Sequence, residues 1–88
     1  MEFEFDPDKD AETRRRRGLS LALGAIVLSN QVGEIDDTRR DYGERRMIAF
    51  GMIGDRLRVC VYTQRGEVYR IISLRKANRK EVRRWQRP

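Results

Sequence analysis

The hydrophobic pattern changes its period at Gly43, and this change constrains the fold more than any other feature of the chain. After this glycine, apolar residues recur at every second position, which is typical of half-buried strands. Leu57, Val59 and Val61 follow this alternation, and Gly54-Asp55 is a two-residue hairpin signal. We therefore expect an antiparallel meander of three or more strands, with strands near residues 46–51, 57–62 and 67–73.

Two local signals define the end of this meander. Gln64-Arg65-Gly66 predicts a tight turn into the last strand. The two faces of that strand should carry different residues, Tyr69 and Ile71 against Val68, Arg70 and Ile72. The spacing of Asn78 and Glu81 is that of a capping box, which starts a final helix with Val82 and Trp85 on one side.

The beginning of the chain favours a short strand and then a helix. Residues 2–5 alternate glutamate and phenylalanine, as a half-buried strand does. Asp6 is a good N-cap and Pro7 fits the first helical position, so a helix should begin there. This helix should reach Arg16 or Arg17, because Gly18 readily takes the left-handed conformation that ends a helix.

Ser20 is expected to cap a second helix over residues 21–29, which is apolar nearly all round and should pack inside. Residues 31–42 are polar and acidic, and predict an irregular connection, with or without a short strand near 32–35. The expected order is an N-terminal strand, two helices, the meander and a C-terminal helix. This order indicates one α+β domain over residues 1–88, with helices against one face of a small sheet.

The positive charge is concentrated at the C-terminal end. The chain carries 20 basic and 14 acidic residues, a net charge of +6. Residues 70–88 contain eight arginines and lysines and one acid, which leaves 12 basic and 13 acidic residues in the first 69. Such a segment attracts a polyanion such as a nucleic acid. The competing interpretation is a solvated helix that keeps the protein soluble.

Several classes of site are disfavoured by composition. The chain has no histidine and one cysteine, Cys60, so neither an internal disulfide nor a zinc cluster is expected. We expect no metal, no cofactor and a cytoplasmic protein. The longest apolar run, 21–28, is too short to cross a bilayer. Cys60 lacks a histidine partner and is expected to be a strand residue and not a nucleophile.

Four stretches together resemble the BrnT family of toxins. Phe3–Lys9 resembles its F-E-W-D-P-x-K opening, and Arg17-Gly18-Leu19-Ser20 its K-H-G-[VI]-S turn. Glu44-Arg45-Arg46 with Gly51 resembles E-x-R-F…G. The longest match joins Val61–Gly66, Arg70–Ala77 and Glu81, which resemble V-x-T-x-R-G…R-I-I-S-x-R-x-A-x-x-x-E.

The resemblance implies a RelE-like fold and an endoribonuclease that cleaves RNA to arrest translation. It also implies neutralisation by an antitoxin of the BrnA family, in a heterotetramer. In that family the antitoxin carries the DNA-binding module, so this chain would contact DNA only indirectly.

The chain departs from the family pattern at the turn. Thr13 replaces an asparagine, Met47 replaces a phenylalanine, and Arg16-Arg17 replaces Lys-His. Loss of the histidine removes the usual proton-transfer group. The candidates that are left do not separate on sequence grounds: Glu44, Glu67, Tyr42, Tyr62 and Lys9.

Arginines are the best candidates for the active surface, because a guanidinium binds two phosphate oxygens and stabilises negative charge. The expected catalytic residues are Arg46, Arg70, Arg75 and Arg17. Those expected to bind substrate are Arg16, Ser73, Lys76 and Arg79. Arg46 and Arg70 should lie on neighbouring strands, and Arg75 should follow the last strand where the chain turns.

Each of these residues also has a purely structural interpretation. Arg16 and Arg17 could be a solvated helix end. Arg46 and Arg70 could form cross-strand salt bridges with Glu44 or Glu67. Ser73 could cap or stabilise a turn, and Trp85 could belong to the core or to an antitoxin contact.

Two other functions compete with the nuclease. The first is a catalytically degenerate relative that binds RNA or an antitoxin without cleaving. The second is a DNA-binding regulator, which the basic last helix permits, although no helix-turn-helix pair is evident.

Overall fold

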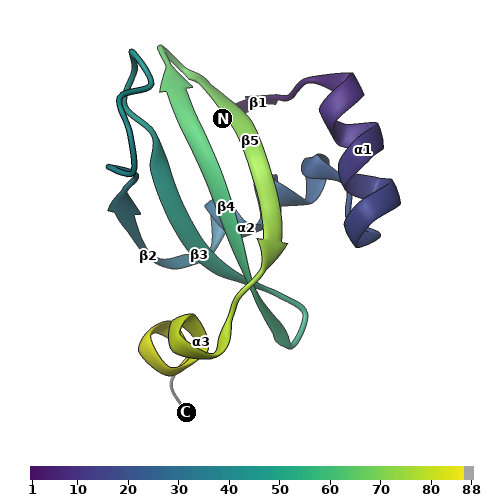
Figure 1. Cartoon of the computed structure of the whole chain (residues 1–88), viewed down its shortest axis with the longest axis vertical. Helices are drawn as coiled ribbons and strands as arrows, with labels where there is room; N and C mark the ends of the chain where they lie inside the picture. Colours follow the sequence, from purple (N-terminus) through teal and green to yellow (C-terminus); the bar gives the residue numbers. More distant parts are fainter. Residues whose placement is uncertain (87–88) are drawn as a thin grey trace.

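The computed structural model describes residues 1–86 and is an α+β structure with one five-stranded sheet (Figure 1). The strands are β1 (Glu2–Glu4), β2 (Gln31–Asp36), β3 (Met47–Ile53), β4 (Arg56–Arg65) and β5 (Val68–Lys76). The helices are α1 (Pro7–Arg17), α2 (Gly24–Ser29) and α3 (Arg79–Trp85), and a 3-10 turn, η1 (Leu21–Leu23), precedes α2. Arg87, part of the basic C-terminal segment, lies outside the described residues.

The sheet is mixed, in the order β1-β5-β4-β3-β2. Strands β2 to β5 form the expected antiparallel meander, which has four strands because residues 31–36 are a full strand. The N-terminal strand β1 adds to the other edge, parallel to β5, where Phe3 is opposite Tyr69.

Most local signals were correct, and the differences are small. Gly54 takes a φ of +63° in the β3–β4 turn, and Gly18 ends α1 with a φ of +66°. The second turn is at 66–67 and not 64–66, because β4 extends to Arg65. The helix expected over residues 21–29 is divided, with η1 before α2.

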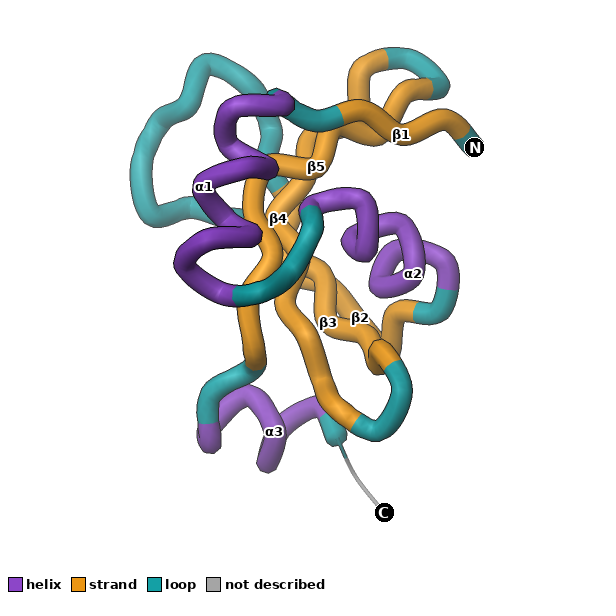
Figure 2. Tube along the Cα trace, turned by 90° about the vertical axis from the view of Figure 1, so that its right-hand side faces the viewer, coloured by secondary structure: helices purple, strands orange, loops and turns teal. Residues whose placement is uncertain are grey.

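The two faces of the sheet differ in their cover. The helical face, which carries Cys60, Tyr62 and Leu74, packs against Leu21 and Val27 of η1 and α2. The open face carries Val59, Thr63, Arg70 and Arg75 of β4 and β5. Figure 2 shows the sheet nearly edge-on, with α2 on one side and the long loop before β3 on the other.

The expectation that the helices pack on one face is wrong for α3. This helix covers one end of the open face, where Phe50, Leu57 and Val59 form a second apolar cluster. Its Trp85 ring stacks on Phe50 with centroids 4.8 Å apart. These strand residues are shielded from water by Val82 and Trp85 of α3, and this burial of apolar surface is favourable.

A β-bulge at Ile72 determines which way Arg75 points. Tyr62 is opposite Ile71 and Val61 is opposite Ser73, so Ile72 has no partner in the ladder. Simple alternation would place Arg70 and Arg75 on opposite faces. The extra residue shifts the alternation by one, which is how bulges re-aim side chains. Because of this shift, Leu74 lies on the helical face opposite Cys60, and Arg75 lies on the open face with Arg70.

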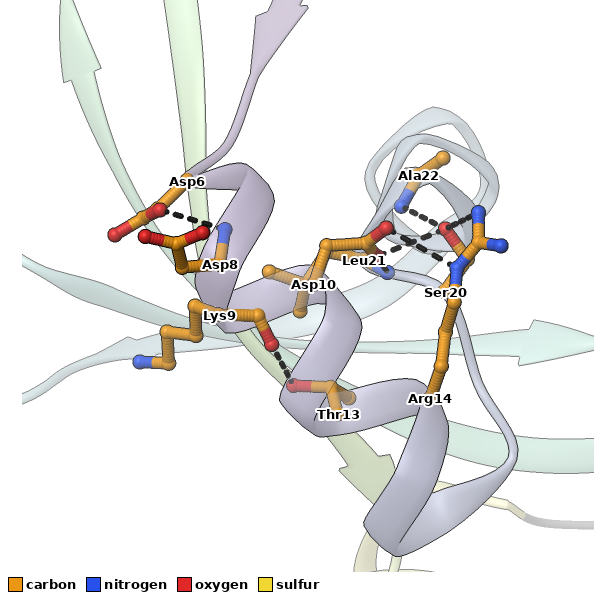
Figure 3. A network of polar contacts seen from close by, with 9 residues as sticks. All are labelled: Asp6, Asp8, Lys9, Asp10, Thr13, Arg14, Ser20, Leu21 and Ala22. Atoms are coloured by element: carbon orange, nitrogen blue, oxygen red, sulfur yellow. Dashed lines mark hydrogen bonds and ion pairs between the residues drawn. The ribbon is translucent and has the colours of Figure 1, made fainter.

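A buried carboxylate joins α1 to the turn before α2 (Figure 3). Asp10 Oδ1 accepts hydrogen bonds from the Leu21 backbone N–H at 2.6 Å and from the Ser20 hydroxyl at 3.0 Å. Its Oδ2 is 3.1 Å from Arg14 Nε. These bonds, above all the one from Leu21, lower the pKa of Asp10. They hold α1 against the turn that leads into η1.

Candidate functional site

A basic pocket of about 420 Å³ lies where the end of α1 meets the end of β5. It is lined by four cations and one leucine: Arg16, Arg17, Arg75, Lys76 and Leu19. Strand β1 pairs only with Val68, Tyr69 and Arg70 of β5. The edge of β5 beyond Arg70 is therefore open to hydrogen bonds from α1. There Arg17 Nη1 donates to the Leu74 carbonyl at 2.9 Å. The pocket thus joins four of the eight residues singled out from sequence.

Arg75 is held in place by the first turn of α3. It lies within β5, not after it as expected, because the strand runs on to Lys76. Its Nη1 and Nη2 donate to Glu81 Oε1 and Oε2 at 2.8 and 2.9 Å, a two-bond geometry that fixes the guanidinium plane. Glu81 is also the capping-box acid, as expected. Arg75 holds the pKa of Glu81 below its usual value.

Arg70 lies on the open face further up β5. Its Nη1 is 3.2 Å from Glu4 Oε1 on the parallel strand β1, so the expected partners, Glu44 or Glu67, are wrong. Glu44 instead pairs with Arg65 at 3.1 Å. Arg70 is opposite Thr63, which pairs it with β4 and not with β3.

Arg46 immediately precedes β3 and reaches the same face from the other side of β4. The register of β3 and β4, with Met47 opposite Tyr62, brings it level with Thr63 and hence with Arg70. Arg46 and Arg70 are therefore not on neighbouring strands, because β4 lies between them. The Arg46 guanidinium lies 4.0 Å from the centre of the Tyr42 ring.

Lys9 on α1 is electrostatically coupled to two of these arginines. Its pKa is lowered mainly because the ammonium is partly buried, and in addition by the charges of Arg46 and Arg17. Glu12 and Asp6 act on the same ammonium in the opposite sense and raise its pKa.

The remaining residues singled out from sequence are more scattered. Ser73 lies on β5 opposite Val61 and is half-buried, so it neither caps a helix nor forms a turn. Arg79 is the first residue of α3 and is exposed. Arg70 and Arg75 are five residues apart on one strand, about 16 Å at roughly 3.3 Å per residue. Arg46 and Arg70, which lie on either side of Thr63, are called here the Arg46–Arg70 pair. This pair and the pocket are the two ends of one basic surface.

The proton-transfer candidates differ in their surroundings and in the direction of their pKa shifts. Tyr62 lies on the helical face and donates to Glu34 at 2.6 Å, and burial raises its pKa. Arg65 lowers the pKa of Glu44, which makes that carboxylate a weaker base. Glu67 is exposed in the β4–β5 turn. Lys9 is the one amine among the five candidates, and its pKa is lowered by burial and by the charges of Arg46 and Arg17.

Other chemistry finds little support within residues 1–86. Burial raises the pKa of the Cys60 thiol to about 12, as suits a strand residue in the core. In this part of the chain, no cluster of three or more histidine, cysteine or acidic side chains is arranged to hold a metal ion. None of its helices has the length and apolar character needed to cross a membrane.

Sequence reasoning missed the acids that hold the site in place. Glu4 and Glu81 each orient one arginine, and Asp37 anchors the loop that carries Tyr42. The capping-box spacing identified Glu81, but not its contact with Arg75. Glu4 gave no signal, because its pairing depends on the parallel addition of β1 to β5.

Comparison with known proteins identifies the family. Among curated proteins, none matches the sequence significantly. Residues 5–81 match the family model described as the ribonuclease toxin, BrnT, of type II toxin–antitoxin systems. This match covers most of the chain, including both the basic pocket and the Arg46–Arg70 pair. The chain therefore belongs to the BrnT family of ribonuclease toxins of type II toxin–antitoxin systems.

Proposed function

We propose that this chain is an active endoribonuclease whose basic open face and pocket bind and cleave RNA, and that cleavage arrests translation. The observation that carries the proposal is the pocket, where guanidinium groups from α1 and β5 meet with Lys76. Phosphate is the ligand that such a group of cations binds best. The RelE-like fold implied by the resemblance stays a prediction.

The proposed chemistry is attack of the RNA 2′-oxygen on the adjacent phosphorus. The new bond joins the 2′-oxygen to phosphorus, and the bond from phosphorus to the 5′-oxygen breaks. The products are a 2′,3′-cyclic phosphate and a free 5′-hydroxyl. Water takes the 2′-proton. Arg46 and Arg70 stabilise the negative charge that develops on the phosphate oxygens, and Arg17 and Arg75 hold a neighbouring phosphate of the RNA in the pocket.

We assign proton donation to the leaving 5′-oxygen to Lys9. Arginine is a poor choice for this step because its pKa lies above about 12. Burial and the charges of Arg46 and Arg17 lower the pKa of Lys9, so this ammonium releases its proton more readily. Water then restores the proton to the amine. This assignment gives the chain a proton-transfer group in the absence of histidine.

The direct test is cleavage of a defined single-stranded RNA by the purified chain. Lys9→Met should slow cleavage by about 10²-fold or more, within the range usual for general acid catalysis. Lys9→Arg keeps the charge and should bind RNA as tightly as wild type while cleaving as slowly as Lys9→Met. If Lys9→Arg cleaves at the wild-type rate, Lys9 acts through charge alone and the assignment is wrong.

A second candidate function is a binding module without nuclease activity. The observation in its favour is that Arg70 and Arg75 already have carboxylate partners in Glu4 and Glu81. A phosphate would have to compete with these acids or share the arginines with them. RNA that is bound at low salt but stays intact over long incubation would establish this alternative.

We further propose that the partner is a BrnA-like antitoxin that covers the basic face in a heterotetramer in the cytoplasm. The type II family implies a protein antitoxin. An acidic or shape-complementary segment is the kind of ligand that this surface would bind. Co-purification with the product of an adjacent short gene, and loss of RNA cleavage in that complex, would test this proposal.

A further inference from the structure

The loop of residues 37–46, between β2 and β3, is pinned at both ends. The Asp37 N–H donates to the Arg46 carbonyl at 2.8 Å, and the Thr63 hydroxyl donates to the Arg45 carbonyl at 2.8 Å. The loop crosses the side of the sheet away from α2 (Figure 2). Its closing residue, Arg46, therefore enters the open face at a fixed point.

A buried carboxylate organises the interior of this loop. The Asp37 side chain is 0% exposed and accepts three hydrogen bonds from Arg39, at 3.2, 2.8 and 2.7 Å. Arg39 is the main cause of the lowered pKa of Asp37, and the Tyr42 hydroxyl contributes to it. The Gly43 N–H donates to Asp41 Oδ1 at 2.8 Å, in a turn that sets the direction of the chain beside Tyr42.

The Tyr42 ring is the contact that fixes the Arg46 guanidinium. The guanidinium carbon lies 4.0 Å from the ring centre, well inside the range of a cation–π contact. Arg46 Nε is buried and has no hydrogen-bond partner among the described residues. Arg40 also approaches this ring, at 5.4 Å. Unlike Arg70 and Arg75, Arg46 is held in place by an aromatic face.

We infer that Tyr42 is a positioning residue, which acts by holding the Arg46 guanidinium toward Lys9 at the reacting phosphate. This inference rests on the proposed function for its catalytic meaning, but the placement of Arg46 can be measured without any cleavage. Because an aromatic face leaves the guanidinium hydrogen-bond donors free, an arginine held this way stays available to a phosphate. A carboxylate partner would compete with the substrate for those donors.

The test compares Tyr42→Leu with Tyr42→Phe by NMR titration of the lysine ammonium groups. The chain has three lysines, Lys9, Lys76 and Lys80, so the Lys9 signal can be assigned from its loss in Lys9→Arg. Tyr42→Leu removes the ring face and should raise the pKa of Lys9, because Arg46 is no longer held near it. Tyr42→Phe keeps the ring and should leave the pKa of Lys9 close to that of wild type.

Cleavage provides the second readout. Tyr42→Leu should lower kcat by about tenfold or more, in line with the loss of about 1–2 kcal/mol from a cation–π contact. Tyr42→Phe should restore most of that loss. Tyr69→Leu is the matched control, since Tyr69 is also half-buried but lies on the helical face against Phe3 and Tyr62. It should lower stability without changing the pKa of Lys9.

The outcomes separate this inference from the proposed function. An unchanged Lys9 pKa and an unchanged kcat in folded Tyr42→Leu would overturn the positioning role while leaving the nuclease intact. A raised Lys9 pKa in a protein whose wild type never cleaves RNA would support the positioning role and refute the nuclease. Equal effects of Tyr42→Phe and Tyr42→Leu would assign the role to the hydroxyl and Asp37, against the inference.

Discussion

The helical face of the sheet is stabilised by apolar burial, whereas the open face carries cations that are held by specific partners. Leu21, Val27 and Leu74 are fully buried on the helical face. On the open face, Arg70 and Arg75 are oriented by acids and Arg46 by a tyrosine ring. The larger apolar cluster thus lies on the helical face, and the open face is apolar only under α3, which leaves its remaining surface to like charges.

The largest effect should come from breaking the helical face. Leu74→Ala removes a fully buried side chain and should lower the free energy of unfolding by about 2–5 kcal/mol. Ile26→Ala is the control on α2, because Ile26 is 42% exposed and buries less area. Urea denaturation measures both, and equal losses in the two variants would contradict this view of the core.

The open face should show the reverse, a large effect on activity with little effect on stability. Arg75→Met should raise the KM for RNA cleavage about tenfold or more, because a charge-assisted hydrogen bond to a phosphate in the pocket contributes about 1.5–3 kcal/mol. Its ion pair with Glu81 is partly buried, and losing it should lower the free energy of unfolding by only about 1 kcal/mol. Arg56→Met, an exposed change in the β3–β4 hairpin, should leave cleavage unaltered. A severely unfolded Arg75→Met would place this residue among the stabilising contacts instead.

A smaller and pH-dependent effect is expected at Asp10, which joins α1 to the turn before α2 on the helical side. Asp10 has a folded-state pKa below its ordinary value of 3.8, so its contribution to stability is present above about that pH. The contribution is lost as the pH falls through the lowered pKa. Asp10→Asn should therefore be less stable than wild type at pH 7, and the difference should shrink in acid. A difference that stays constant from pH 7 to pH 2 would argue against a role for the charge.

The smallest change in native protein is expected at Cys60, whose rate of alkylation reports how rarely the helical face opens. The pKa of its thiol is about 12, so almost no thiolate exists near pH 8. Native protein should react with iodoacetamide far more slowly than protein in urea. Fast modification of the native chain would mean that the core opens readily.

The local parts of the fold could be predicted because their signals lie within a few residues. Asp6, Pro7 and Gly18 bound α1 as expected, and Gly54 forms its hairpin. The capping box at Asn78 begins α3. In each case the stabilising contact lies close to the residue that gives the signal.

The rest depended on contacts between distant segments. The bulge at Ile72 has no signature of its own, yet it decides the face on which Arg75 lies. The parallel pairing of β1 with β5 places Glu4 beside Arg70, a separation of 66 residues. The sequence therefore identified the arginines as a group, but not the partners that orient them or the role of Tyr42.

Contact mapping with an uncleavable RNA shows where the substrate lies on the sheet. A short RNA with 2′-O-methyl groups cannot supply the attacking 2′-hydroxyl, and its binding can be followed by NMR of the backbone amides. We predict that the shifted signals cluster at Arg17, Arg46, Arg70 and Arg75. Shifts confined to α2 and β2, with these four residues unchanged, would mean that RNA binds elsewhere and that the basic open face is not its site.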